Sequence, residues 1–156
     1  YRVGPFVSDE YIDDSDIQGW REFFVNVLSV KEEATSEQVE RFAEEYVKDK
    51  LVKRGYKILR SHEKGFDYEA KMEGSSILVE VKGRKKTIDE IEINLTEAET
   101  HEAYEHKENY WIAVVVNIPN SPTLYIIKDP TRAVREVVIK GKHLKEELKK
   151  LVEVWS

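Results

Sequence analysis

Ile77-Leu78-Val79-Glu80-Val81-Lys82 is an apolar run that ends in a glutamate and a lysine. A fully buried strand normally reads as uninterrupted Val, Ile and Leu. Charged side chains at the end of such a strand cost stability unless they are paired, solvated or bound to a metal. The run therefore predicts a buried strand with a functional group at its end.

A second motif, Gly65-Phe66-Asp67, places an aspartate thirteen residues before Glu80. The intervening sequence predicts a hairpin with arms at 66–72 and 76–82, joined by the turn residues 73–75. Side chains alternate along a strand, so Glu80 shares a face with its neighbours two residues away. We expect Asp67, on the paired arm, to lie beside Glu80 on that face.

The surrounding pattern predicts an α/β sandwich around a mixed sheet, with antiparallel hairpins in its first half. Thr35-Ser36 can cap a long helix that ends at Gly55, and Thr96-x-x-Glu99 is a capping box that opens a second helix to about His106. The expected strands are 56–61, 66–72, 76–82, 110–118, 124–127 and 134–139, and the last expected element is a helix over 144–154. Residues 83–92 read as a charged connector.

The chain divides into an N-terminal region (1–34) and an α/β domain (35–156). Residues 1–18 are polar and acidic, and aromatic residues at helical spacing predict a short amphipathic helix over 20–28. The first residue is Tyr1 rather than methionine, so we expect a domain of a longer protein, with the first region as a linker from an upstream domain.

Composition limits the chemistry. The chain has no cysteine and one methionine, which excludes disulfides, thiolate metal sites and cysteine nucleophiles. Abundant Lys and Glu with few thermolabile residues favour an intracellular protein of a heat-adapted organism, a thermophile. No signal peptide and no apolar run near the length of a membrane span is evident. A homodimer is compatible with the sequence.

The net charge of −6 argues against binding of nucleic acid by bulk electrostatics, because such binding is driven by Lys and Arg. Two routes to nucleic acid remain: a local basic patch, or a neighbouring domain that delivers the substrate. Arg84-Lys85-Lys86 is the densest positive cluster and follows the Glu80 strand directly. It is either a solvated loop or a contact for phosphates.

Asp67, Glu80 and the backbone carbonyl of Val81 suit a hard cation such as Mg²⁺ or Mn²⁺. Such a cation polarises a phosphate and acidifies a bound water, and Lys82 would orient that water or stabilise transition-state charge. Glu-x-Lys occurs three more times in the chain, so the spelling alone proves nothing. The alternative is that Glu80 and Lys82 face solvent and that Asp67 lies in an ordinary turn.

Other chemistries receive less support. His101 and His106 are five residues apart and do not share a helix face, which argues against zinc. We expect no ligand-like neighbours for His62 and His143. Neither a hydrolase triad nor a glycine-rich phosphate loop emerges. Trp20, Tyr104 and Trp111 are interpreted as core or interface aromatics.

Asp67, Glu80 and Lys82 match the motif of the PD-(D/E)xK nuclease superfamily. More narrowly, residues 36–128 resemble the NO VEIN C-terminal-like domain. The motifs that carry this resemblance are Gly65-Phe66-Asp67, Val79-Glu80-Val81-Lys82-Gly83, Leu95-Thr96-x-x-Glu99-x-x-x-Ala103 and Tyr110-Trp111. The resemblance implies a restriction-endonuclease-like mixed sheet flanked by helices, with an αβββαβ core.

This resemblance also implies a metal-dependent DNA endonuclease that uses Mg²⁺ or Mn²⁺, within a larger nucleic-acid-processing or defence protein. It implies one more carboxylate from the first helix, for which Glu44 fits best and Glu45 is the alternative. Glu99 matches the family position on the second helix, although it is equally the capping partner of Thr96.

The segment 20–24 resembles the stretch that often precedes this domain in ATPase or helicase-like proteins. The rival interpretations are a non-catalytic module of the same fold that binds nucleic acid or protein, and a structural unit that docks a partner through its aromatic helix.

Overall fold

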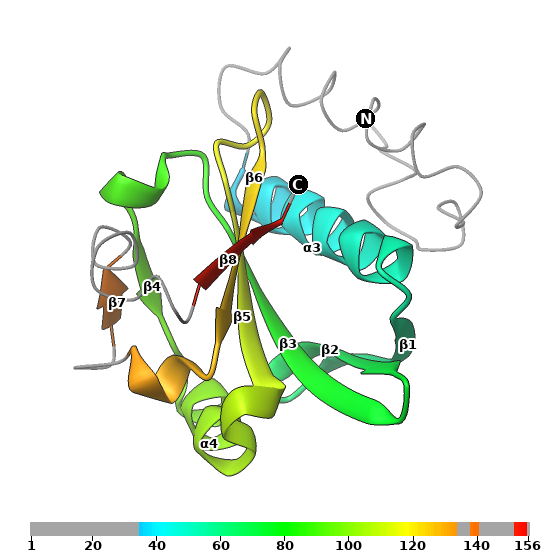
Figure 1. Cartoon of the computed structure of the whole chain (residues 1–156). Coiled ribbons are helices and arrows are strands. Elements are labelled where there is room, and N and C mark those ends of the chain that lie inside the picture. Colours follow the sequence, from blue (N-terminus) through cyan, green and yellow to red (C-terminus); the bar gives the residue numbers. More distant parts are fainter. Residues whose placement is uncertain (1–34, 134–137, 141–151, 156) are drawn as a thin grey trace.

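The computed structural model describes residues 35–133, 138–140 and 152–155 of the 156-residue chain (Figure 1). Two α-helices and eight strands lie within these residues, together with three short 3-10 helices. The helices are α3 (Ser36–Lys53) and α4 (Glu97–His106). The strands are β1 (Lys57–Glu63), β2 (Phe66–Met72), β3 (Ser75–Gly83), β4 (Glu92–Asn94), β5 (Tyr110–Val116), β6 (Thr123–Lys128), β7 (Val138–Lys140) and β8 (Val152–Trp155).

Six of these strands form one mixed sheet, in the order β1-β2-β3-β5-β6-β8. Only β3 and β5 are parallel, and α4 lies in the crossover between them. All other neighbours in this sheet are antiparallel. The α/β class and the mixed sheet are as expected from the sequence, and they are compatible with a restriction-endonuclease-like fold.

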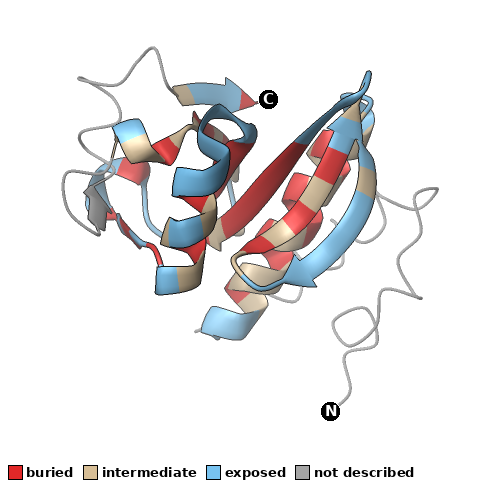
Figure 2. Cartoon of the chain, turned by 90° about the horizontal axis from the view of Figure 1, so that it is seen from below, coloured by how far each residue is buried: buried red, intermediate tan, exposed pale blue. Residues whose placement is uncertain are grey.

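Two apolar clusters form on opposite faces of the sheet. Helix α3 covers one face, where Phe42, Val47 and Leu51 pack on the inward side chains of β2, β3 and β5. Helix α4 and strand β4 cover the other face, where Ile93 and Ala103 are buried. Figure 1 shows α3 and α4 on either side of the sheet, and Figure 2 shows that each helix has a buried and an exposed side.

The predicted hairpin of β2 and β3 is confirmed. Strand β2 begins and ends where the pattern predicts, and β3 extends one residue beyond the expected arm at each end. Leu78 faces the α4 side while Val79 and Val81 face the α3 side, which confirms the predicted alternation. Every residue of β5 is buried, as expected for a central strand.

The predicted C-terminal helix over 144–154 is wrong at its end. Residues Val152–Trp155 form β8, which pairs antiparallel with β6, and residues 141–151 lie outside the described part of the chain. The indole ring of Trp155 packs edge-on against that of Trp111 with ring centroids 5.9 Å apart. Pairing at the sheet edge and this aromatic contact outweigh the helical spacing of the apolar residues.

The connector 83–92 carries more structure than its charge suggested. A 3-10 helix (η3, Ile88–Glu90) is capped by Thr87, and β4 begins directly afterwards and pairs with β7 in a small second sheet. Ile88 and Ile91 are buried in the α4-side cluster. Isolated apolar residues in a charged stretch were the available signal, and their spacing is too irregular to indicate a strand.

Several expectations differ in extent or lie outside the described residues. The strand predicted over 56–61 runs to Glu63, and Tyr104, interpreted as a core or interface aromatic, is about half exposed. Strand β7 confirms 138–139 of the strand expected over 134–139, whereas 134–137 are not described. The arm and helix expected within 1–34 also lie outside the described residues. None of the described helices is both long and apolar enough to span a membrane.

Helix α3 crosses the end of β3 at very short range, and Gly83 is the residue that allows it. A Cβ atom at Gly83 would lie 2.8 Å from the Ala43 Cβ and 2.9 Å from the Val39 carbonyl oxygen. Real Cβ atoms do not approach neighbours so closely, so any side chain would push α3 away from the strand. The glycine therefore fixes the distance between α3 and the polar end of β3.

We predict that Gly83→Ala destabilises the fold by about 1–3 kcal/mol, the usual cost of overpacking a tight contact. The cost arises because backbone of α3, and not a flexible side chain, must move. Urea-induced unfolding measures the change, with Ser75→Ala at the exposed start of the same strand as the control, expected within about 0.5 kcal/mol of the parent. Equal stability of the two variants would contradict the close approach.

Candidate functional site

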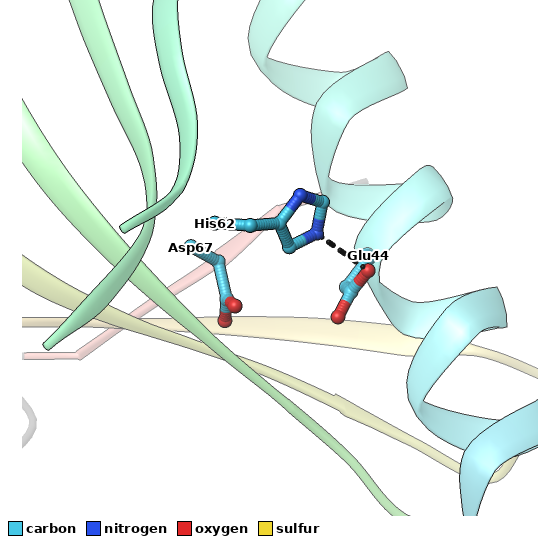
Figure 3. A group of neighbouring side chains, drawn as sticks. All are labelled: Glu44, His62 and Asp67. Atoms are coloured by element: carbon cyan, nitrogen blue, oxygen red, sulfur yellow. Dashed lines mark hydrogen bonds and ion pairs between the residues drawn. The ribbon is translucent and has the colours of Figure 1, made fainter. Parts of the chain in front are cut away.

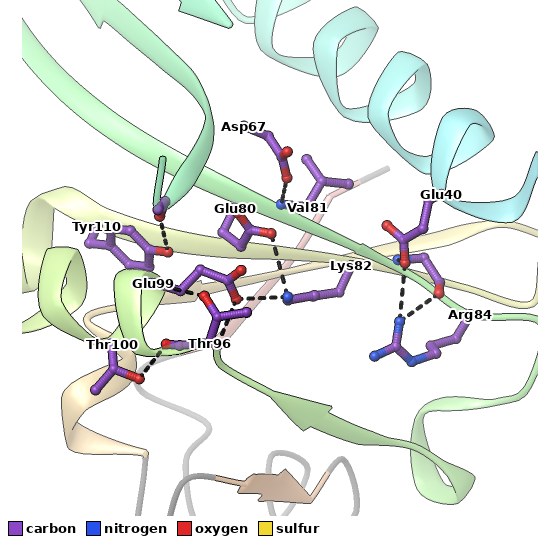
Figure 4. Close-up of polar contacts among 12 residues, drawn as sticks. Glu40, Asp67, Glu80, Val81, Lys82, Arg84, Thr96, Glu99, Thr100 and Tyr110 are labelled. Atoms are coloured by element: carbon purple, nitrogen blue, oxygen red, sulfur yellow. Dashed lines mark hydrogen bonds and ion pairs between the residues drawn. The ribbon is translucent and has the colours of Figure 1, made fainter. Parts of the chain in front are cut away.

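The candidate site lies where β2 and β3 separate. Their pairing ends at Tyr68 opposite Val79, although β3 continues to Gly83. Beyond that pair, the backbone N–H of Val81 donates a hydrogen bond to Oδ2 of Asp67 over 2.7 Å (Figure 4). The aspartate side chain thus takes the place of a ladder partner, which holds its carboxylate at the level of the strands.

The turn before Asp67 is fixed from two directions. Gly65 has φ of +93°, a conformation that favours glycine, and a Cβ there would lie 2.9 Å from the Ala98 carbonyl oxygen of α4. The buried Tyr110 hydroxyl donates a 2.8 Å hydrogen bond to the Gly65 carbonyl oxygen. Burial, and next the nearby carboxylates, raise the pKa of Tyr110, so its hydroxyl keeps the proton that it donates. The Gly-Phe-Asp motif is therefore a rigid support for Asp67.

Glu80 and Lys82 face the α4 side of the sheet and meet Glu99 of that helix. The Lys82 ammonium lies 2.8 Å from Oε1 of Glu99 and 3.4 Å from Oε2 of Glu80. All three side chains are largely buried. The alternative of two solvent-facing side chains on this strand is therefore wrong.

Glu80 holds a proton more tightly than an ordinary glutamate. Burial, and next the charge of Asp67, raise the pKa of Glu80 to about 9, although Lys82 opposes the rise. The ammonium lies closer to Glu99 than to Glu80, so the charge of Lys82 is mainly balanced by Glu99. Without a further cation, Glu80 therefore ionises less readily than an ordinary glutamate.

Glu99 makes two sets of contacts, of which the capping box confirms one of its two sequence interpretations. It completes the capping box of α4, in which its carboxylate accepts from the Thr96 N–H at 3.2 Å and its own N–H donates to the Thr96 hydroxyl. The same Oε1 accepts from Lys82. Burial lowers the pKa of Lys82, but Glu80 and Glu99 outweigh burial and raise it, so the lysine stays charged.

On the other face, Glu44 of α3 reaches the site through His62 of β1. The Nε2 atom of His62 lies 3.0 Å from Oε2 of Glu44, and one ligand atom from each of Glu44, His62 and Asp67 lies within 4.8 Å of the others. Figure 3 shows these three side chains pointing toward one another between the helix and the strands. Burial raises the pKa of Glu44, Asp67 adds to the rise, and the hydrogen bond with His62 opposes it.

Glu45, the alternative to Glu44, is buried and does not belong to this group. The structure therefore places Asp67 between two groups: Glu44 with His62 on the α3 side, and Glu80 with Lys82 on the α4 side. Glu99 joins the second group from α4.

The basic cluster after β3 divides into two parts. Arg84 lies 3.3 Å from the Glu40 carboxylate and donates to the Gly83 carbonyl oxygen, so it ties the strand end to α3 (Figure 4). Lys85 and Lys86 are exposed. The two lysines are therefore the part of the cluster that faces solvent.

Sequence reasoning missed two residues of the site, His62 and Glu40. The expectation that His62 has no ligand-like neighbours is wrong, because β1 extends past the predicted end and places His62 opposite Asp67, between the pairs Ser61–Tyr68 and Glu63–Phe66. The turn at 64–65 was the signal that could have shown this.

Glu40 is one helical turn before Glu44 and therefore lies on the same side of α3. Its Oε1 accepts from the Gly83 N–H at 3.1 Å. Burial raises the pKa of Glu40, against the effect of that hydrogen bond. The spacing of four residues was the available signal.

The donor set fits a divalent cation. Burial raises the pKa of both Glu44 and Glu80, and the negative charge of Asp67 adds to the rise in each. A divalent cation relieves this repulsion and favours the ionised carboxylates. Carboxylate oxygens suit Mg²⁺ or Mn²⁺, and among the described residues the group whose ligand atoms lie close enough to share one ion is Glu44, His62 and Asp67.

A cavity of about 340 Å³ lies between strands β1, β2 and β3 and the C-terminal end of α4. Phe66, Leu78 and His106 are among its lining residues, and the candidate site residues are not. The cavity therefore adjoins the turn that carries Asp67 but is separate from the carboxylate group.

These features define an α/β protein with a carboxylate and lysine cluster at the fork of two strands. Residues 39–127 match the family model described as Protein NO VEIN, C-terminal, which covers more than half of the chain, and the chain belongs to this family. No curated protein and no solved structure shows a match to the chain.

We predict that the stability of the metal-free domain falls as pH rises, and that Glu80 is a main cause. Folded Glu80 loses its proton near pH 9, whereas the ordinary pKa is 4.5, so between these values the folded chain binds more protons than the unfolded chain. In that window the free energy of unfolding falls by up to about 1.4 kcal/mol per pH unit relative to Glu80→Gln. Urea unfolding of both proteins with a chelator, at several pH values, measures the difference. Parallel curves would show that Glu80 titrates normally.

Proposed function

We propose that this domain is a metal-dependent DNA endonuclease of the PD-(D/E)xK type. The observation that carries the proposal is the meeting of Asp67, Glu80 and Lys82 at the strand fork, with Asp67 bonded to the Val81 N–H. A buried lysine beside two acidic groups suits phosphodiester hydrolysis, because it supplies metal ligands and a fixed positive charge.

Asp67, Glu80 and the Val81 carbonyl oxygen would hold a Mg²⁺ or Mn²⁺ ion, with Glu44 as a further ligand. When bound, the ion supplies Lewis acidity toward the phosphate and a water of lowered pKa. Lys82 donates a hydrogen bond toward a phosphate oxygen or the attacking water, and its charge stabilises the transition state. Glu99 keeps Lys82 protonated and oriented from the end of α4.

The acidic net charge restricts how DNA reaches the site. Lys85 and Lys86 are the exposed cations of the cluster that follows β3, and we propose that they contact the DNA backbone. Because the chain as a whole carries −6, an ATPase or helicase-like domain of the same parent chain would deliver the substrate.

A second candidate is a non-catalytic module of the same fold that binds nucleic acid or protein. Its support is the charge balance on the α4 side, where Lys82 is already paired with Glu99 and Glu80. A lysine held this way also serves as a purely structural ion pair. The two candidates differ in metal affinity and in turnover, which the following experiment measures.

We predict that the purified chain nicks supercoiled plasmid DNA with Mn²⁺ or Mg²⁺ and not with a chelator. Asp67→Ala and Lys82→Ala each lower the rate by about 10²–10³, because each removes a preorganised group from the reacting centre. Gel quantification of nicked and linear DNA over time gives the rates. Absence of metal-dependent nicking in the parent supports the non-catalytic module.

The matched control is Lys128→Ala, which removes a lysine that is ion-paired with Glu153 at the other edge of the sheet. Its rate should equal that of the parent. Nicking that survives both Asp67→Ala and Lys82→Ala would place the activity elsewhere, or in a contaminant. Because Lys82 is buried, the urea stability of each variant shows whether a lost rate reflects unfolding.

We predict that the double variant Lys85→Ala/Lys86→Ala weakens DNA binding about equally for all sequences. Each lysine that neutralises a phosphate contributes about 0.9 to the slope of log K against log salt, so the slope should fall by about 2. Fluorescence anisotropy with a labelled duplex at several salt concentrations, in Ca²⁺ to limit cleavage, measures this. An unchanged slope would assign the two lysines to a solvated loop.

A further inference from the structure

His62 brings a nitrogen atom to a group that otherwise offers only oxygen ligands. Three elements contribute to this group: Glu44 from α3, His62 from β1 and Asp67 from β2. Side chains from three separate elements converge here, and one ligand atom of each lies within 4.8 Å of the others (Figure 3).

The spacing suits shared coordination. Two adjacent ligands at about 2.1 Å from one octahedral cation are about 3 Å apart, and Nε2 of His62 lies 3.0 Å from Oε2 of Glu44. The His62 side chain is 44% exposed, so a hydrated cation can reach it from solvent. The imidazole needs little rearrangement to exchange its hydrogen bond with Glu44 for a bond to a metal.

We propose that His62 is a metal ligand and that it gives the site a preference for Mn²⁺ and related transition cations over Mg²⁺. This inference rests on the proposed function, because both place a divalent cation at Asp67. Imidazole is a good ligand for first-row transition metals, whereas Mg²⁺ takes oxygen ligands and retains its waters. An imidazole added to the carboxylates around Asp67 therefore makes the site discriminate between the cations through its nitrogen atom.

A second histidine–glutamate pair in the chain provides a matched comparison. Nε2 of His106 lies 3.1 Å from a carboxylate oxygen of Glu102, with similar exposure, but both residues belong to α4 and are four positions apart. Within the described residues, no third ligand group joins that pair. Both pairs therefore share the histidine–glutamate contact, and the pair at His62 differs in having Asp67 as a third potential ligand.

The test uses the whole chain, titrated with Mn²⁺ alone, and electron spin-echo modulation of the bound ion. We expect a ¹⁴N coupling from a coordinated imidazole in the parent and in His106→Asn, and its loss in His62→Asn. Asparagine is chosen because His62 has φ of +56°, which asparagine tolerates. By calorimetry, Mn²⁺ affinity should fall at least about tenfold in His62→Asn, and Mg²⁺ affinity by much less.

Bound Mn²⁺ without nitrogen coupling in the parent, or a coupling that persists in His62→Asn, would overturn the inference. Urea unfolding of His62→Asn checks that the fold is intact, and Asp67→Asn checks that the ion lies at this group. Plasmid cleavage with no nitrogen coupling would leave the proposed function standing and the inference refuted. Nitrogen-coupled Mn²⁺ without cleavage would support the inference and refute the nuclease.

Discussion

The hydrogen bond between the Val81 N–H and the Asp67 carboxylate is the interaction on which the site depends. Strand β2 leaves β3 after the pair Tyr68–Val79, so the Val81 N–H would otherwise lack a partner inside the sheet. An unsatisfied buried N–H is costly, and the aspartate removes this cost while it places its own charge at the fork. The carboxylate is then accessible to Glu44 on the α3 side and to Glu80 on the α4 side. The Val81 N–H therefore holds a carboxylate that side chains on both faces of the sheet approach.

The other side chains of the site form a cluster of carboxylates with a single buried lysine. Carboxylates from α3, β2, β3 and α4 converge between two apolar clusters, and burial raises the pKa of Glu40, Glu44 and Glu80. This crowding alone lowers the stability of the folded chain, because buried carboxylates of like charge repel one another. Lys82 compensates one end, where it meets Glu99. Around Asp67, at the opposite end, the carboxylates of Glu44 and Glu80 add to the crowding.

Much of this arrangement could be predicted from sequence, because local signals are strong where the chain is most regular. The alternating side chains of the hairpin, the capping residues of the helices and the continuous apolar run of β5 each indicate the structure that forms. The hairpin alone predicted that Asp67 lies beside Glu80, but not that the Asp67 carboxylate also approaches Glu44 and His62 on the α3 side. Glu99 was harder, because the capping motif does not indicate that the same carboxylate also accepts a hydrogen bond from Lys82 of β3.

The failures have a common physical cause, which is that long-range contacts set the outcome. Strand β8 forms because it pairs with β6 and because Trp155 packs on Trp111, neither of which is visible in the spacing of its own residues. His62 was dismissed because its partners lie on another helix and another strand. A search for ligands near in sequence finds neither of them.

The close approach at Gly83 also has a consequence for the order in which the site assembles. The Asp67–Val81 contact spans 14 residues, whereas the contact between Glu40 and the Gly83 N–H spans 43. Longer loops cost more entropy to close, so the hairpin with its aspartate forms at lower cost than the docking of α3. Docking then brings Glu40 and Glu44 against a carboxylate that is already in place. Of these two contacts, the docking of α3 is therefore the one that concentrates the negative charge, and a divalent cation would act on folding there.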